Sequence, residues 1–84
     1  METTYRVRSI GFAVDGTVKI IVIRERRFEG ELISSDQWGG EIQRGTDLTT
    51  FELPCQWGDG KIDPVSLNDF PAERDYILAK WAEL

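Results

Sequence analysis

The 84-residue chain contains no histidine and a single cysteine, Cys55. Without histidine, no side chain titrates near neutral pH unaided, and neither a serine nor the cysteine has an imidazole to activate it. A lone cysteine cannot form an intramolecular disulfide or a cysteine cluster around a metal ion. We therefore expect no catalytic residues, no metal site and no cofactor, and a reducing compartment.

Long apolar runs are also missing. No segment approaches the roughly 20 apolar residues that cross a bilayer, and residues 1–5 have neither the basic nor the apolar part of a signal peptide. We expect a cytoplasmic protein with no membrane partner. A chain of 84 residues is long enough for one domain, 1–84, and too short for two.

The charge is acidic overall and unevenly distributed. The net charge is −5, but residues 1–28 hold six basic and three acidic residues, whereas residues 29–84 hold four basic and twelve acidic ones. An acidic surface repels nucleic acid and attracts a basic partner over long distances. The distribution favours a protein partner with a basic surface and makes nucleic acid the weaker hypothesis.

The clearest β signal lies in residues 5–25, where two β-prone runs flank Asp15-Gly16. This dipeptide predicts a two-residue type I′ turn and a β-hairpin. The register that follows puts Ile10 opposite Ile21.

One face of this hairpin is too apolar for a plain solvent-exposed surface. We expect a homodimer that buries it. The residues of this predicted dimer face are Ile10, Phe12, Ile21 and Ile23.

The middle of the chain predicts shorter strands. A third strand is expected at 28–34, turn formers fill 34–40, and a second hairpin is expected between 41–43 and 48–53. Pro54 predicts the end of that strand because proline cannot donate a ladder hydrogen bond, and the residues from Trp57 to Pro64 are expected to form a loop.

The last residues have helical periodicity. Ile77, Trp81 and Leu84 recur at helical spacing, Asp69 is a candidate N-cap and Pro71 suits the first turn. The predicted fold is therefore α+β: a small antiparallel sheet, made of the N-terminal β-hairpin plus two to three further short strands, packed by one C-terminal amphipathic helix.

Residues 59–63, Asp-Gly-Lys-Ile-Asp, resemble the middle of an EF-hand calcium loop. The first and third ligand positions then fall on Cys55 and Trp57, and the bidentate twelfth position falls on Ser66. Too few oxygen ligands remain, so the segment predicts an acidic turn without a metal.

The best candidates for contact with a partner are two tryptophans beside glycines and the acids near them. A tryptophan in such a segment either folds back over the core or is presented to a partner, and the sequence leaves both readings open. The candidate residues are Trp38, Trp57, Asp36, Glu41, Asp59 and Asp63.

These observations favour a non-enzymatic protein-binding module that acts through acidic loops and exposed aromatics. A small, acidic domain without histidine is typical of phage and mobile-element inhibitors that bind and block a larger, nucleic-acid-handling host complex. The first alternative is a nucleic-acid-binding module that uses the basic residues of the first hairpin. Those residues are Arg6, Arg8, Lys19, Arg24, Arg26 and Arg27. The second alternative is a small carboxylate-dependent enzyme, for which no acid pair stands out.

Overall fold

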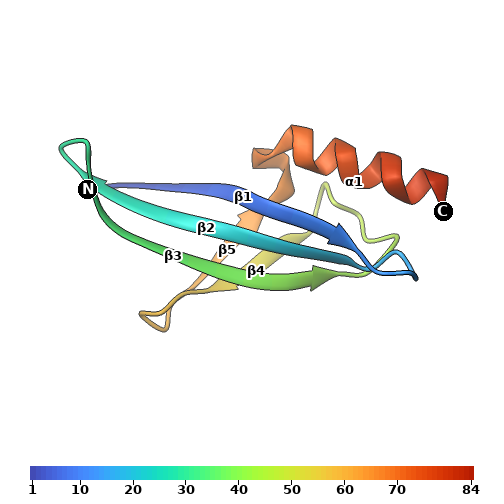
Figure 1. Cartoon of the computed structure of the whole chain (residues 1–84), viewed down its shortest axis with the longest axis horizontal. Coiled ribbons are helices and arrows are strands. Elements are labelled where there is room, and N and C mark those ends of the chain that lie inside the picture. The colour runs from blue at the N-terminus through green and yellow to red at the C-terminus, as the bar shows by residue number, and fades with distance from the viewer.

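A computed structural model describes residues 1–84 as two antiparallel sheets and two helical segments (Figure 1). The first sheet has the order β1 (Glu2–Phe12), β2 (Val18–Phe28), β3 (Glu31–Ile42). The second sheet pairs β4 (Glu52–Gln56) with β5 (Ile62–Ser66). The 3-10 helix η1 (Leu67–Asp69) and the helix α1 (Pro71–Glu83) follow. The predicted small α+β fold with a C-terminal helix is confirmed.

The core lies between the first sheet and a layer made by the β4–β5 hairpin and α1. We call the covered side of the first sheet its inner face and the uncovered side its outer face. The buried apolar cluster comprises Val18, Ile20, Val22, Ile42, Leu48, Leu53, Cys55, Trp57, Val65, Leu67, Ile77 and Trp81. This cluster draws on β2, β4, β5 and α1, so both sheets and the helix share one core.

The connection from β1 to β2 differs from the predicted type I′ turn. The Ala13 N–H donates to the Thr17 carbonyl oxygen at 2.8 Å, which leaves a three-residue loop, 14–16, in which Gly16 alone has a positive φ, of 90°. A type I′ turn requires positive φ at both central residues. Glu29 (φ 49°) and Gly30 (φ 83°) meet that requirement, so this turn type joins β2 to β3 instead.

A bulge in β1 combines with this loop to change the predicted register. The pairing shifts between Val7 and Ser9, and Ile10 pairs with Ile20 instead of with Ile21. A bulge places one extra residue in a strand, and every residue beyond it then faces the opposite side of the sheet.

The shifted register divides the predicted dimer face. Ile10 and Phe12 turn to the inner face and pack partly buried against the core. Ile21 and Ile23 remain on the outer face, where they pair with Ser9 and Arg6. The prediction that Ile10, Phe12, Ile21 and Ile23 form one exposed surface is therefore wrong.

Strand β3 is longer than predicted and includes residues 34–40, which had been expected to form turns. Glycine is tolerated there because Trp38 folds over Gly40: a Cβ at Gly40 would overlap the Trp38 ring. The aromatic ring supplies the packing that a glycine lacks in a strand.

The second sheet also departs from the prediction. Residues 41 and 42 are the end of β3 and do not pair with 48–53, and β5 occupies part of the predicted loop between Trp57 and Pro64. Pro54 lies within β4, directly opposite Pro64 of β5. Neither proline has an N–H, so these two opposed residues exchange no backbone hydrogen bonds. The residues on both sides of this pair remain paired.

Helix α1 forms where the sequence predicts it. Pro71 occupies its first turn, but Phe70 and not Asp69 takes the N-cap position, without a side-chain cap bond. Trp81 anchors the far end, because its Nε1 donates a hydrogen bond to the Gly16 carbonyl oxygen at 2.7 Å. With 13 residues, α1 is too short to cross a membrane.

Candidate protein-binding surface

The predicted contact residues Trp57, Asp36, Asp59 and Asp63 converge on one buried cation, Arg24. The Arg24 side chain is 3% exposed, and its Nε and Nη2 donate to the two carboxylate oxygens of Asp36 at 3.1 and 2.7 Å. Its Nη1 lies 3.5 Å from Oδ2 of Asp59 and 3.7 Å from Oδ2 of Asp63. The guanidinium carbon also lies 4.8 Å from the ring centroid of Trp57. We call these residues the Arg24 cluster.

The register of the first sheet explains this cluster. Every second residue of β2 from Val18 to Arg24 is buried, and the Arg24 side chain therefore points inward. Asp36 is its direct neighbour on β3. A buried guanidinium is costly unless it is paired and hydrogen-bonded. The β4–β5 hairpin supplies the remaining charges, because Asp59 also bonds Arg26 at 2.7 Å and Asp63 accepts a bond from the Tyr5 hydroxyl at 3.2 Å. The cluster thus ties the two sheets together.

Arginine side chains lower the pKa of two carboxyl groups in the cluster, those of Asp59 and Asp36. The hydrogen bond from Arg26, assisted by the Lys61 backbone N–H, lowers the pKa of Asp59 to about 2. The hydrogen bond from Arg24 also lowers the pKa of Asp36. Both carboxyl groups are therefore ionised at neutral pH and act as ion-pair partners.

The low pKa of Asp59 predicts a specific dependence of stability on pH. Its unfolded pKa is about 4 and its folded pKa about 2, so its stabilising contribution is fully present above about pH 4 and is lost as pH falls through 2. We expect the difference in melting temperature between the wild type and Asp59→Asn to narrow over this range. Thermal unfolding followed by circular dichroism measures it, and a constant difference would contradict the assignment.

Both candidate tryptophans cover the core. Trp57 is 3% exposed, and its ring lies 5.9 Å from that of Tyr5. Trp38 is half-buried, packs against the core cluster and lies over Gly40. The sequence leaves open whether each tryptophan covers the core or faces a partner. In the structure both rings lie over the core. Among the predicted contact residues, Glu41 alone lies on the outer face, beside Lys19.

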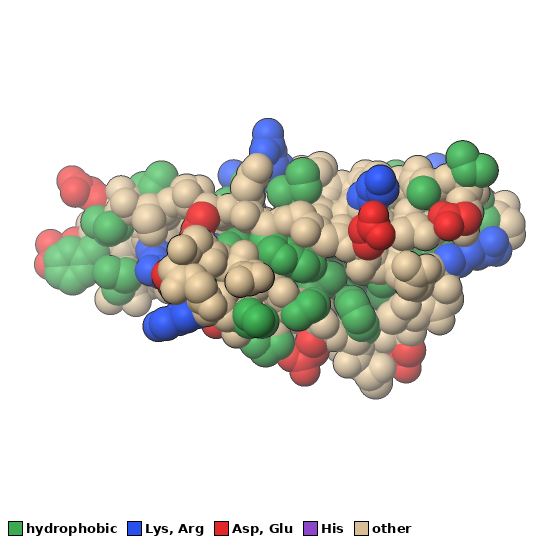
Figure 2. All heavy atoms as spheres, turned by 90° about the horizontal axis from the view of Figure 1, so that it is seen from below, with side chains coloured by type: hydrophobic (Ala, Val, Ile, Leu, Met, Phe, Trp, Pro, Cys, Tyr) green, Lys and Arg blue, Asp and Glu red, His purple; other side chains and the backbone are tan.

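A surface that the sequence analysis missed lies at the end of the first sheet, where β2 turns into β3. All eight residues from Phe28 to Ser35 are exposed, and this end projects beyond α1 (Figure 1). Apolar and acidic side chains gather there (Figure 2). We call residues 28–33 the hairpin tip.

The hairpin tip exposes three large apolar side chains. Phe28, Leu32 and Ile33 are 53%, 49% and 55% exposed, and the register puts Phe28 and Leu32 on opposite faces of the sheet. Glu29 and Glu31 lie between them and form no ion pair. The sequence carries a signal for this surface, because apolar residues stand on both sides of Glu29-Gly30.

The predicted nucleic-acid-binding cations do not share one face. Arg6, Arg8, Lys19 and Arg27 belong to the outer face, whereas Arg24 and Arg26 belong to the inner face. Glu25 neutralises part of the outer group, since it lies 3.5 Å from Arg6 and 3.6 Å from Arg27.

The Arg24 cluster is arranged around a guanidinium, and no group of three His, Cys, Asp or Glu side chains is placed to hold a metal ion. The chain matches no family model, no curated protein and no solved structure at a significant level.

Proposed function

We propose that the protein is a protein-binding module whose contact surface is the hairpin tip. The observation that supports this most strongly is a projecting turn with three large apolar side chains, each about half exposed. Exposed apolar groups gathered in one place are typical of interaction sites, and an aromatic residue such as Phe28 is a frequent source of binding energy.

The charge of the hairpin tip defines the chemistry of the partner. Glu29 and Glu31 are unpaired within the chain, and the whole chain carries a net charge of −5. A complementary surface is an apolar groove with lysine or arginine at its rim, and opposite charges speed the encounter. Basic surfaces are characteristic of proteins that handle nucleic acids, so a module that occupies such a groove would act as an inhibitor of its partner.

A pair of isoleucine variants tests this proposal. Ile33 in the hairpin tip and Ile62 in β5 are 55% and 61% exposed, so Ile33→Ser and Ile62→Ser remove the same side chain from two surfaces. Proteins captured with the tagged wild type are identified by mass spectrometry, and the affinity of each purified partner is then measured by calorimetry. We expect Ile33→Ser to weaken binding roughly tenfold and Ile62→Ser to leave it unchanged. Equal effects of the two variants would refute the hairpin tip as the contact.

The competing function is nucleic-acid binding through the outer face. It is favoured by Arg8 and Lys19, which have no carboxylate partner, and by Arg6, whose side chain is 59% exposed. Mobility-shift titrations with single- and double-stranded DNA and RNA at two salt concentrations separate the two functions. Tight binding that weakens with salt and is lost in Arg8→Ala would establish this alternative over the protein partner.

A further inference from the structure

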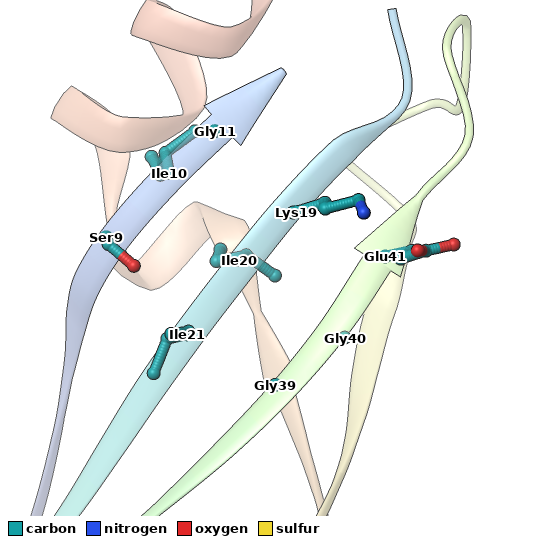
Figure 3. A pocket seen from close by; sticks show the side chains of 9 residues that line it. All are labelled: Ser9, Ile10, Gly11, Lys19, Ile20, Ile21, Gly39, Gly40 and Glu41. Atoms are coloured by element: carbon teal, nitrogen blue, oxygen red, sulfur yellow. The ribbon is translucent and has the colours of Figure 1, made fainter. Parts of the chain in front are cut away.

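The outer face of the first sheet contains a shallow groove at the end nearer the β1–β2 loop (Figure 3). Ile21 of β2 lies at its centre, between Ser9 of β1 and Gly39 of β3. The short side chains on both sides of Ile21 leave the groove open. Lys19 and Glu41 flank it in the next row of the sheet, and neither forms an ion pair within the chain.

A ridge crosses the other half of the same face. Nη1 of Arg8 on β1 donates a hydrogen bond to Oε1 of Gln37 on β3 at 2.7 Å, so this pair spans β2. Beneath it lies Ile23, which is 8% exposed although no other layer covers the outer face. Groove and ridge are therefore adjacent, one centred on Ile21 and the other on Ile23.

We propose that a second copy of this chain packs on the outer face, with the strands of the two sheets running in opposite directions. A two-fold axis across the strands, between Ile21 and Ile23, places the ridge of each copy in the groove of the other. An axis along the strands would instead stack ridge on ridge and Lys19 on Lys19. Shape and charge therefore select the first arrangement.

The charges of the two halves also complement each other in this arrangement. The row that holds Lys19 and Glu41 comes to lie against the row of the second copy that holds Glu25, next to Arg6 and Arg27. Lys19 then lies against Glu25 of the second copy, and Glu41 lies against Ser35, its β3 counterpart in that row. The outer face carries both signs of charge and suits a copy of itself, whereas the hairpin tip carries unpaired acids alone and would repel a second tip.

The size of the face agrees with a dimer of modest affinity. Three strands spaced about 4.8 Å apart over about 25 Å of strand length bury on the order of 1,000 Å² between two copies, which is near the lower limit for specific interfaces. We therefore expect the dimer to form in a concentration-dependent manner. Because the strands of the two copies run in opposite directions, the two hairpin tips lie at opposite ends of the dimer.

Glycine variants test this dimer without disturbing the monomer. A Cβ at Gly39 or at Gly58 meets no atom within 4 Å, and neither residue has a positive φ. Gly39→Gln fills the groove, whereas Gly58→Gln adds the same side chain to the β4–β5 turn as a matched control. Molar mass is measured by sedimentation equilibrium from about 10 μM to about 1 mM, and circular dichroism verifies that each variant is folded.

The wild type and Gly58→Gln should rise from 9.6 kDa toward twice that mass with increasing concentration. Gly39→Gln should dimerise at least about tenfold more weakly. A wild type that stays at the monomer mass throughout, or a Gly39→Gln variant that dimerises as well as the control, would overturn the proposal. Ile33→Ser should dimerise normally, so loss of the dimer and loss of hairpin-tip binding are separate outcomes.

Discussion

Replacing Arg24 by methionine is expected to lower the free energy of unfolding by about 3 kcal/mol, because it leaves three carboxylates without their shared cation. Methionine retains most of the apolar stem, so the change removes mainly charge and hydrogen bonds. The three carboxylate side chains are 30–38% exposed and can be hydrated again in the variant. The expected loss of stability is therefore at the lower end of the range for breaking a buried ion pair. Urea denaturation followed by tryptophan fluorescence measures it.

Arg26→Met is the matched control for this variant. Arg26 bonds only Asp59, and its side chain is 30% exposed. We expect a loss of about 1 kcal/mol or less, as for other partly exposed ion pairs. Equal losses for the two arginine variants would show that Arg24 is not the centre of the cluster.

Trp57→Ala should lower the free energy of unfolding by about 3–5 kcal/mol, the range for deleting a large buried aromatic side chain. The ring is 3% exposed and lies against both Tyr5 and Arg24. Trp57→Phe retains part of the volume and should cost clearly less. Thermal and urea unfolding of both variants measure the difference. A Trp57→Ala protein of wild-type stability that has lost its partner would instead show that the ring is a contact residue.

The parts of the fold that were predictable follow from local chemistry. Ile77 and Trp81 keep helical spacing, and Pro71 fits the first turn of α1, so the helix was placed correctly. The β1–β2 hairpin was also placed correctly, because apolar, β-branched residues flank a turn signal at Asp15-Gly16. In each case residues close in sequence determine the structure.

The register could not be predicted because it depends on one extra residue. The dipeptide Asp15-Gly16 fits a two-residue loop and a three-residue loop equally well, and nothing in the composition of β1 marks a bulge beside Val7. The error moved Ile10 and Phe12 to the wrong face.

The role of the acids was hidden for a different reason. Asp36, Asp59 and Asp63 are spread over residues 36–63, and only the paired sheets bring them to Arg24. A sequence does not distinguish an acid on a free surface from one that neutralises a buried cation. One clue was present: Arg24 continues the alternating series of inward-facing apolar residues in β2 and therefore needed a partner.

Photo-crosslinking in living cells shows whether the hairpin tip contacts a protein. Leu32 in the hairpin tip and Leu78 on α1 are 49% and 44% exposed, so a benzoylphenylalanine at either site is similarly accessible. We predict a discrete adduct with a protein other than this chain from position 32, and no such adduct from position 78. Adducts of equal yield from both positions, or none from position 32, would show that the hairpin tip is not the contact surface.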